Sequence, residues 1–212
     1  MDLASAPVTV QLAAFERMVM TNPVIATIID RISQLGLAGC YLAAGALSQT
    51  VWNCMSDRDP RTGIDDYDIN YFDDTDLGWD AEDKVIRRAA ELFADLDARI
   101  EVRNEARVHL WYEDKFGIGC PRYDGTEAAI RSFPSTSSCF GIRPTGTGIQ
   151  TYAPYGFTDL FSFRARPNPV LAPRHVYEAK TARWRREWPR LTVMPWPADE
   201  PETTKLAGSG HH

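Results

Sequence analysis

The segment GIDDYDINYF, residues 63–72, decides the fold expected of this chain. Residues two apart in a β-strand point to the same side of the sheet, so a strand over 64–72 would have one polar and one largely apolar face. The first face would carry Ile64, Asp66, Asp68 and Asn70, and the second Asp65, Tyr67, Ile69 and Tyr71. The alternation predicts a strand that covers a core on one side and presents carboxylates on the other.

Asp66 and Asp68 would lie about 6–7 Å apart along this strand. Two carboxylates so close repel each other unless a positive charge lies between them. Mg²⁺, or Mn²⁺ in its place, suits this position because such ions prefer oxygen ligands and are held by one or two carboxylates with substrate phosphates. The alternative is a solvated, acidic edge strand without a metal, since short acidic motifs give many false matches.

The composition indicates a globular protein with one domain, or one domain with an extension: 212 residues, 44% hydrophobic and 25% charged. No apolar run approaches the roughly 20 residues that span a bilayer, and the N-terminal sequence lacks the features of a secretory signal. We therefore expect no membrane partner and a cytoplasmic location. The four cysteines form no CxxC pair, which argues against structural zinc and for reduced thiols.

The charge is distributed unevenly along the chain. Residues 1–100 carry 8 Lys and Arg against 17 Asp and Glu, whereas residues 101–212 carry 15 against 12. A basic second half that faces an acidic metal site would suit an enzyme that acts on nucleotides. A solvated acidic loop with helix-capping residues would explain part of the same asymmetry.

Hydrophobic periodicity predicts alternating helices and strands. Helices are expected over 12–20, 23–34, 46–55, 79–96, 126–133, 158–163 and 174–188, and strands over 40–44, 64–72, 99–103, 106–112 and 150–153. In the strand over 99–103, Glu101 would point away from the apolar residues on either side of it. In the strand over 106–112, Arg107 and His109 would share the polar face.

The order of these elements resembles the polymerase-β-type nucleotidyltransferase superfamily. Its signature is an apolar strand that ends in Gly-Gly or Gly-Ser, then a strand with Asp-x-Asp or Asp-x-Glu, then a third carboxylate on a later strand. The matching positions are Gly45-Ala46, Asp66 with Asp68, and Glu101. The segments AGALSQTVWN, IDDYDINYFD, IEVRNEARVHLWYEDKFG, APYGFTDLF and KTARWRREWP resemble a bacterial nucleotidyltransferase-like family of undefined substrate, over roughly residues 20–196.

This resemblance implies an α/β (α+β) fold with a small mixed β-sheet, helices on one face and an open polar face. A nucleotidyltransferase-like catalytic core would span residues 20–112. An extension over 113–197 would pack on it to give one compact unit, and residues 198–212 would form a tail whose end looks like part of an expression tag.

The resemblance also implies a catalytic set of three carboxylates, Asp66, Asp68 and Glu101, as ligands of Mg²⁺ or Mn²⁺. In two-metal sites the ions lie about 3.5–4 Å apart and stabilise the attacking and leaving oxygens. Glu101 would complete a metal shell or accept the proton of the attacking hydroxyl. The alternative for Glu101 is a strand residue that pairs with Arg99 or Arg103.

Nucleotide contacts are expected from Gly45, Ala46, Ser48, Arg107 and His109. Ala46 offers no hydroxyl to a phosphate, but its backbone N–H can bind one at a helix N-terminus; Ser48 is nearby, although its position does not match the signature. Arg107 would bind the triphosphate or neutralise neighbouring acids. His109 would orient the acceptor or serve as a hydrogen-bonded structural group.

Three further features have two interpretations each. Asp159 is expected at a helix N-cap rather than in the site. The six tryptophans are expected to pack in the core or a lid rather than to stack on bases. The helix over 174–188, made basic with the residue after it by Lys180, Arg183, Arg185, Arg186 and Arg190, would contact RNA or form a solvated face.

Two functions are therefore compatible with the sequence. The leading hypothesis is a metal-dependent nucleotidyltransferase that moves an NMP from an NTP to a hydroxyl or phosphate acceptor and releases pyrophosphate. The acceptor could be RNA, protein or a small molecule. The second hypothesis is a catalytically silent nucleotide- or RNA-binding module with the same fold, which Ala46 favours.

Overall fold

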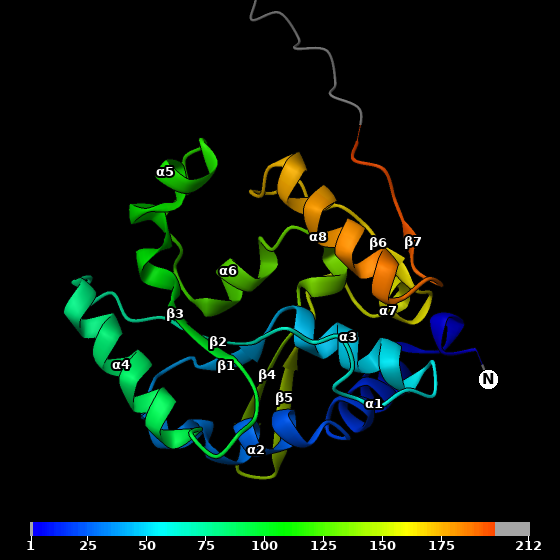
Figure 1. Cartoon of the computed structure of the whole chain (residues 1–212), viewed down its shortest axis with the longest axis horizontal. Coiled ribbons are helices and arrows are strands. Elements are labelled where there is room, and N and C mark those ends of the chain that lie inside the picture. Colours follow the sequence, from blue (N-terminus) through cyan, green and yellow to red (C-terminus); the bar gives the residue numbers. More distant parts are fainter. Residues whose placement is uncertain (1, 198–212) are drawn as a thin grey trace, which may run out of the picture.

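A computed structural model describes residues 2–197 of the chain; the tail expected over 198–212 lies outside the described residues. The strands are β1 (Tyr41–Ala43), β2 (Tyr67–Tyr71), β3 (Ile100–Asn104), β4 (Gly141–Thr145), β5 (Gly148–Tyr152), β6 (Arg164–Ala165) and β7 (Thr192–Val193). The first five form one sheet in the order β3-β2-β1-β4-β5, and β6 pairs with β7 (Figure 1).

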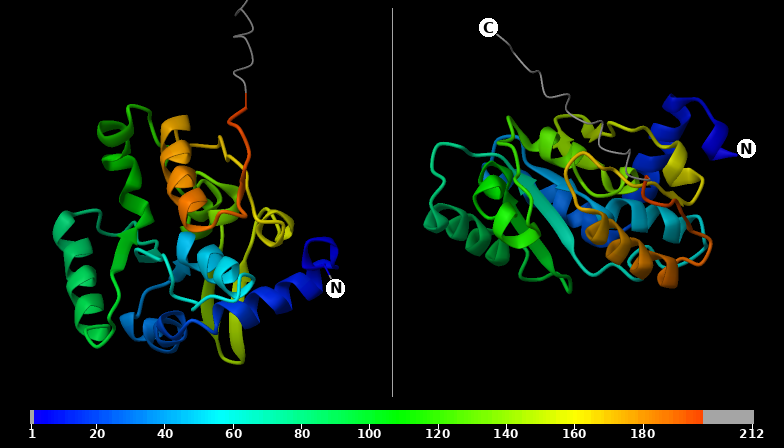
Figure 2. Two further views of the ribbon diagram at one scale, coloured as in Figure 1. Left: turned by 45° about the vertical axis from the view of Figure 1, so that its right-hand side comes forward. Right: turned by 90° about the horizontal axis from the view of Figure 1, so that it is seen from above.

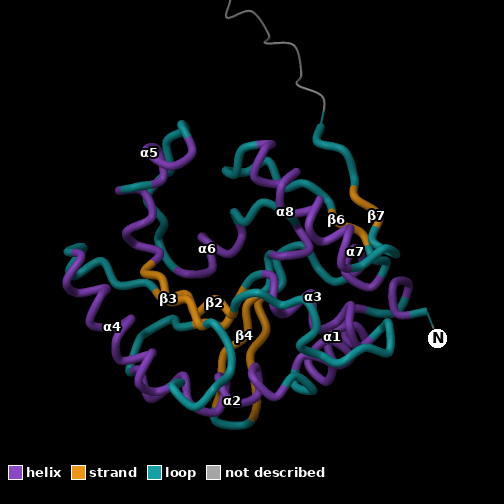
Figure 3. Tube along the Cα trace, in the orientation of Figure 1, coloured by secondary structure: helices purple, strands orange, loops and turns teal. Residues whose placement is uncertain are grey.

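The helices surround this sheet (Figure 3). The α-helices are α1 (Val8–Val19), α2 (Pro23–Arg31), α3 (Gly45–Cys54), α4 (Trp79–Leu92), α5 (Tyr112–Phe116), α6 (Thr126–Arg131), α7 (Thr158–Phe161) and α8 (Arg174–Glu187). Short 3₁₀ helices are η1 (Leu3–Ser5), η2 (Ile32–Leu35), η3 (Glu105–Leu110) and η4 (Thr136–Ser138).

The sheet is mixed, as predicted. β2 pairs with β1 in an antiparallel and with β3 in a parallel manner, and β4 is antiparallel to both β1 and β5. The parallel pair is connected through α4, because parallel neighbours need a long crossover. The α/β fold class expected from the sequence is confirmed.

The local sequence explains how α2 begins. The side chain of Asn22 accepts hydrogen bonds from the backbone N–H groups of Val24 and Ile25, and Pro23 occupies the first helical position, where its missing N–H costs nothing. The helical path continues through η2 and closes at Gly36, whose φ of +64° is readily adopted by glycine.

One face of the sheet lies on the main core. Tyr67, Ile69 and Tyr71 of β2 are buried there with the apolar residues of α1, α2 and α3. The same cluster includes residues of the second half of the chain, such as Ile142 and Trp184, so both halves share one core. The alternation along 67–71 therefore encodes the buried face that the sequence predicted.

The opposite face of the sheet is covered by the second half of the chain. Tyr41 and Ala43 of β1 pack there on Ile130 of α6, and α5 and α8 rise on the same side (Figures 1 and 2). The expectation of an open polar face was wrong in this respect, because these helices enclose a cavity above it.

Two predicted strands differ from the structure. The strand expected over 64–72 begins only at Tyr67, and Ile64 packs against the main core instead of sharing a face with Asp68. The strand expected over 106–112 was wrong, since η3 and α5 occupy this segment. The side chain of Asn104 ends β3 there: its Oδ1 accepts from the backbone N–H groups of Ala106 and Asp73.

Because this segment is helical, Arg107 and His109 do not lie on a strand face. The Arg107 guanidinium forms an ion pair with Glu82, its Nε donates to the Leu77 carbonyl at 2.9 Å, and it lies over the ring of Trp79. The Glu82 carboxylate also accepts from the backbone N–H of Asn104 at 2.8 Å. The side chains of Arg107 and Glu82 are nearly buried, so their ion pair connects η3 to α4 inside the structure.

The ring of His109 is the one described side chain whose buried nitrogens find no hydrogen-bond partner within residues 2–197. The expectation of a hydrogen-bonded structural histidine is not met, and His109 is not among the residues that line the cavity described below.

Among the described helices, none is by itself long and apolar enough to cross a membrane. Val8–Val19 and Pro23–Leu35 together meet the same criteria of length and composition, but as a pair bent by 96°.

Replacing Arg107 with Ala should destabilise the fold. Glu82 would be left buried without its partner, and breaking a buried ion pair costs about 3 kcal/mol of the free energy of unfolding. Urea denaturation measures this loss. The control is Arg87→Ala, which removes an exposed pair with Asp83 and should cost less than about 1 kcal/mol. Equal effects of the two substitutions would contradict the structural role of Arg107.

Candidate functional site

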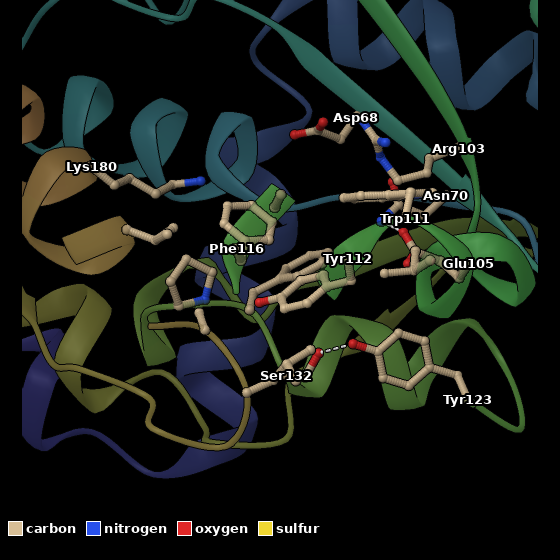
Figure 4. A pocket seen from close by; sticks show the side chains of 17 residues that line it. Asp68, Asn70, Arg103, Glu105, Trp111, Tyr112, Phe116, Tyr123, Ser132 and Lys180 are labelled. Carbon is tan, nitrogen blue, oxygen red and sulfur yellow. Dashed lines mark hydrogen bonds between the residues drawn. The ribbon is translucent and has the colours of Figure 1, made fainter. Parts of the chain in front are cut away.

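A cavity of about 270 Å³ lies between the polar face of the sheet and the helices of the second half of the chain (Figure 4). Its polar lining comes from Asp68, Asn70, Arg103, Glu105, Tyr123, Ser132 and Lys180. Its apolar lining comes from Ala44, Val108, Trp111, Tyr112, Phe116, Phe133, Pro134, Leu171, Ala172 and Val176. The cavity thus joins residues far apart in the sequence.

Asp68 projects from β2 into this cavity and forms no hydrogen bond with a described residue. Burial raises the pKa of its carboxyl to about 6, and the negative charges of Asp66 and Glu101 act in the same direction. The positive charges of Lys180 and Arg103 oppose this shift. The carboxylate is therefore electrostatically undercompensated, as expected for a group that receives a cation or a proton.

Glu105 lies beside the same strand, at the start of η3, and is 4% exposed. Its Oε1 accepts a hydrogen bond of 2.8 Å from the side-chain amide of Asn70. Burial raises the pKa of Glu105 to about 8, against the charge of Arg103 and with that of Asp68. This carboxyl is therefore protonated in the folded protein at neutral pH.

Two cations flank the acidic floor of the cavity. Lys180 reaches in from α8 and Arg103 from β3, on either side of Asp68 (Figure 4). The Arg103 guanidinium lies 5.2 Å from the centre of the Trp111 ring. Cations on both sides of Asp68 favour the binding of an anionic ligand whose negative charges lie on either side of this carboxylate.

The parallel register pairs Asp68 with Glu101, so both residues occupy the same face of neighbouring strands. The Glu101 carboxylate forms an ion pair with Arg99 and approaches Arg103 at 3.7 Å. The pairing with these arginines, which was the alternative for Glu101, is thus what the structure contains. Asp66 directly precedes β2, and its charge acts on Asp68.

Within residues 2–197, no group of three or more His, Cys, Asp or Glu side chains is arranged as a ready metal site. The donor chemistry nevertheless fits a hard cation, because Asp68 has no hydrogen-bond donor and repels Asp66 and Glu101. Mg²⁺ is commonly held by one or two carboxylates plus phosphate oxygens of a substrate.

A strained turn connects β1 to α3 at the edge of the cavity. Ala44 has φ of 64° and ψ of −142°, a backbone conformation that residues with a side chain rarely adopt. Helix α3 begins at Gly45, one residue earlier than predicted, so Gly45 and Ala46 both lie in its first turn. Since no side chain caps α3, its first N–H groups are left for water or a ligand.

Other expected contact residues lie elsewhere. Ala46 is buried inside the first turn of α3, and the buried hydroxyl of Ser48 donates to the Gly45 carbonyl, so the Ser48 hydroxyl is not presented to a nucleotide. Arg107 and His109 do not line the cavity. Asp159 lies in the first turn of α7 rather than at its N-cap, and pairs with Arg166.

The basic residues of α8 have different surroundings. Lys180 faces the cavity, Arg183 pairs with Asp65, and Arg185 and Arg186 are exposed. Of the tryptophans, Trp52, Trp184 and Trp188 pack together in the core, as expected.

Sequence reasoning missed Glu105 and the aromatic residues of α5 as cavity residues. The predicted strand over 106–112 would place Trp111 on the polar face with Arg107 and His109, but the tryptophans were expected to pack in the core or a lid, and no role was assigned to Tyr112 or Phe116. The position of Glu105 could have indicated its role, because this carboxylate directly follows β3, and β3 pairs with the strand that carries Asp68.

Comparison with known proteins agrees with this architecture. The model of a family described as nucleotidyltransferase matches residues 30–193. A solved structure described as a "CCA-adding enzyme head domain", determined by NMR, is 22% identical and has a TM-score of 0.71; the match covers 86% of this chain and 95% of that one. Among curated proteins, none matches.

The stability of the chain should depend on pH through Glu105. Its pKa is about 8 in the folded state and about 4.3 in an unfolded chain, so the folded state binds the extra proton between these values. Stability from this group is therefore lost as pH rises. Urea denaturation without metal should show Glu105→Gln gaining on the order of 2 kcal/mol over wild type between pH 5 and pH 7.

The matched control is Glu113→Gln, which changes an exposed glutamate of α5. Its difference from wild type should stay constant over the same pH range. A constant difference for Glu105→Gln as well would show that Glu105 is ionised in the folded protein.

Proposed function

Because the chain belongs to a nucleotidyltransferase family, we propose that it transfers an NMP from an NTP to a hydroxyl or phosphate acceptor and releases pyrophosphate. The observation that carries this proposal is the undercompensated carboxylate of Asp68 between Lys180 and Arg103 at the cavity floor. The solved neighbour, whose title names a CCA-adding enzyme, supports nucleotide transfer as the class of reaction.

The proposed roles follow from position. Asp66 and Asp68 would hold Mg²⁺ or Mn²⁺ together with phosphate oxygens, and Glu101 would join them on release from Arg99. When bound, the cation would neutralise phosphate charge and align the reacting oxygens. Lys180 and Arg103 would hold the remaining negative charge of the triphosphate, with the uncapped N-terminus of α3.

In the transfer itself, an acceptor oxygen attacks the α-phosphorus and the bond from that phosphorus to the bridging oxygen of the β-phosphate breaks. Pyrophosphate leaves with the electron pair of that bond. The proton of an attacking hydroxyl would pass to Glu101 where this carboxylate is not itself a metal ligand.

The acceptor is left open between RNA, protein and a small molecule. The exposed Arg185 and Arg186 of α8 support an anionic acceptor. A cytoplasmic location, in which the four free cysteines stay reduced, is part of this proposal.

A second candidate is a silent nucleotide- or RNA-binding module. It is favoured by the ion pairs that hold Glu101 away from a metal. This candidate predicts that NTPs bind but that no acceptor mixture yields pyrophosphate.

Substitution of the β2 carboxylates tests the enzyme. With each NTP, Mg²⁺ or Mn²⁺, and total RNA, protein or metabolites as acceptors, wild type should release pyrophosphate. Asp66→Asn and Asp68→Asn should lower the rate at least about 100-fold, because electrostatic stabilisation is usually the largest catalytic term. Both variants should stay folded, and Asp68→Asn should be more stable without metal, since it removes a charge that the site disfavours.

The matched control is Asp74→Asn, an exposed carboxylate of the same acidic segment that should leave the rate unchanged. Mn²⁺ with NTP should raise the melting temperature of wild type and of this control, but not of Asp68→Asn. Pyrophosphate release that persists in both β2 variants would refute the assignment of the site. Tight NTP binding without release from any mixture would favour the silent module.

A further inference from the structure

The cavity lining has two chemically different parts. We call the part lined by Asp68 and Lys180 its charged end, and the part lined by Trp111, Tyr112 and Phe116 its aromatic end; in Figure 4 the rings of Tyr112 and Phe116 lie below Asp68 and Lys180. An NTP has the same division, with a charged triphosphate and a flat, uncharged base. The charged end is explained by the proposed reaction, whereas the aromatic end has no role in it.

The aromatic end is built mainly by α5 and the residue before it. The rings of Tyr112 and Phe116 are 4.5 Å apart, and that of Trp111 lies 5.9 Å from Tyr112 and 6.5 Å from Phe116. Phe133 also lines the cavity. Aromatic rings of this kind bind nucleobases by stacking, with little preference for one base.

A buried polar group with an unused oxygen also lines the cavity. Glu105 is buried and lines the cavity, and its Oε1 is used by Asn70. No described residue forms a hydrogen bond with Oε2 of Glu105. This oxygen is not one of the fully buried side-chain atoms that lack a partner, so part of its surface is accessible. This oxygen is therefore available to a ligand inside the cavity.

We propose that the aromatic end binds the base of the NTP and that Glu105 hydrogen-bonds to the edge of this base, so that Glu105 sets the nucleotide preference. This inference rests on the proposed function for the identity of the ligand. The triphosphate would then lie toward Lys180 and Asp68, which matches the order of groups along a nucleotide.

The protonation state of the Glu105 carboxyl decides which groups of a base it can bind. Because burial keeps Glu105 protonated at neutral pH, its carbonyl oxygen accepts from Asn70 and its O–H donates to a ring nitrogen or carbonyl of the base. Acceptors occupy different positions on the four bases. A single fixed donor on a buried floor therefore favours some bases over others.

Calorimetric titration of the full chain tests this without any turnover. The ligands are ATP, GTP, CTP and UTP with Mg²⁺, and tripolyphosphate as a probe without a base. Wild type should bind its best NTP at least about tenfold more tightly than its worst and than tripolyphosphate, as one discriminating hydrogen bond requires.

Three variants separate the contributions. Glu105→Leu removes the donor and should abolish the preference among NTPs, whereas Glu105→Gln keeps a donor and should retain it. Phe116→Ala should weaken all four NTPs by about tenfold through lost stacking and leave tripolyphosphate unchanged. Glu113→Gln is the exposed control and should bind all ligands as wild type does.

The inference is overturned if wild type binds the four NTPs equally, or if Glu105→Leu binds them with the wild-type preference. Should Glu105→Leu fail to fold, the affinities of wild type for the four NTPs and the binding measured with Phe116→Ala still test the inference. Pyrophosphate assays distinguish a failure of this inference from a failure of the proposed function. Selective NTP binding without pyrophosphate release refutes only the transfer activity. Pyrophosphate release with equal affinity for all four NTPs refutes only the role of Glu105.

Discussion

The alternation of side chains along β2, fixed by its pairing with β1 and β3, is the constraint on which the rest of the structure depends. Tyr67, Ile69 and Tyr71 face the main core, so Asp68 and Asn70 must face the other way. A shift of one residue would bury a carboxylate among apolar side chains and expose the aromatic residues. The apolar core thus holds the polar face in place.

The parallel register with β3 extends this order to the neighbouring strand. Asp68 lies beside Glu101, and Asn70 lies beside Arg103. The same strand ends at Asn104, whose side chain turns the chain into η3 and so brings Glu105 to Asn70. Strand pairing therefore positions the polar side chains of β2 and β3, whereas Lys180 and the aromatic residues are contributed by helices of the second half of the chain.

The site is also where the structure departs most from what is locally favourable. Asp68 and Glu105 are carboxyls kept in a poorly solvated cavity, and Ala44 has a backbone that would suit glycine. Such costs persist only where the surrounding structure imposes them, and they concentrate at functional sites. The main core, with its clustered tryptophans, provides the stability that tolerates them.

Much of the fold could be predicted from the sequence, because Asn22-Pro23 and the periodicity of β2, α4 and α8 are local signals that the tertiary structure preserves. The segment 106–112 could not, since its alternation imitates a strand while the Asn104 cap imposes a helix. In the site, the shared face of Asp68 and Glu101 could be derived from alternation. The same alternation placed Arg103 on the face of Glu101. The positions of Glu105 and Lys180 depend on the cap at Asn104 and on the packing of α8, which the sequence pattern does not encode.

The position of bound Mn²⁺ tests the central claim, that the carboxylates at β2 hold a metal together with a nucleotide. Crystals grown with Mn²⁺ and a non-hydrolysable NTP analogue would locate the ion by its anomalous scattering. We predict Mn²⁺ beside Asp66 and Asp68, bonded also to phosphate oxygens of the analogue. An analogue in the cavity with Mn²⁺ bound only to the acidic segment 73–76, or to no carboxylate of the cavity, would contradict the claim.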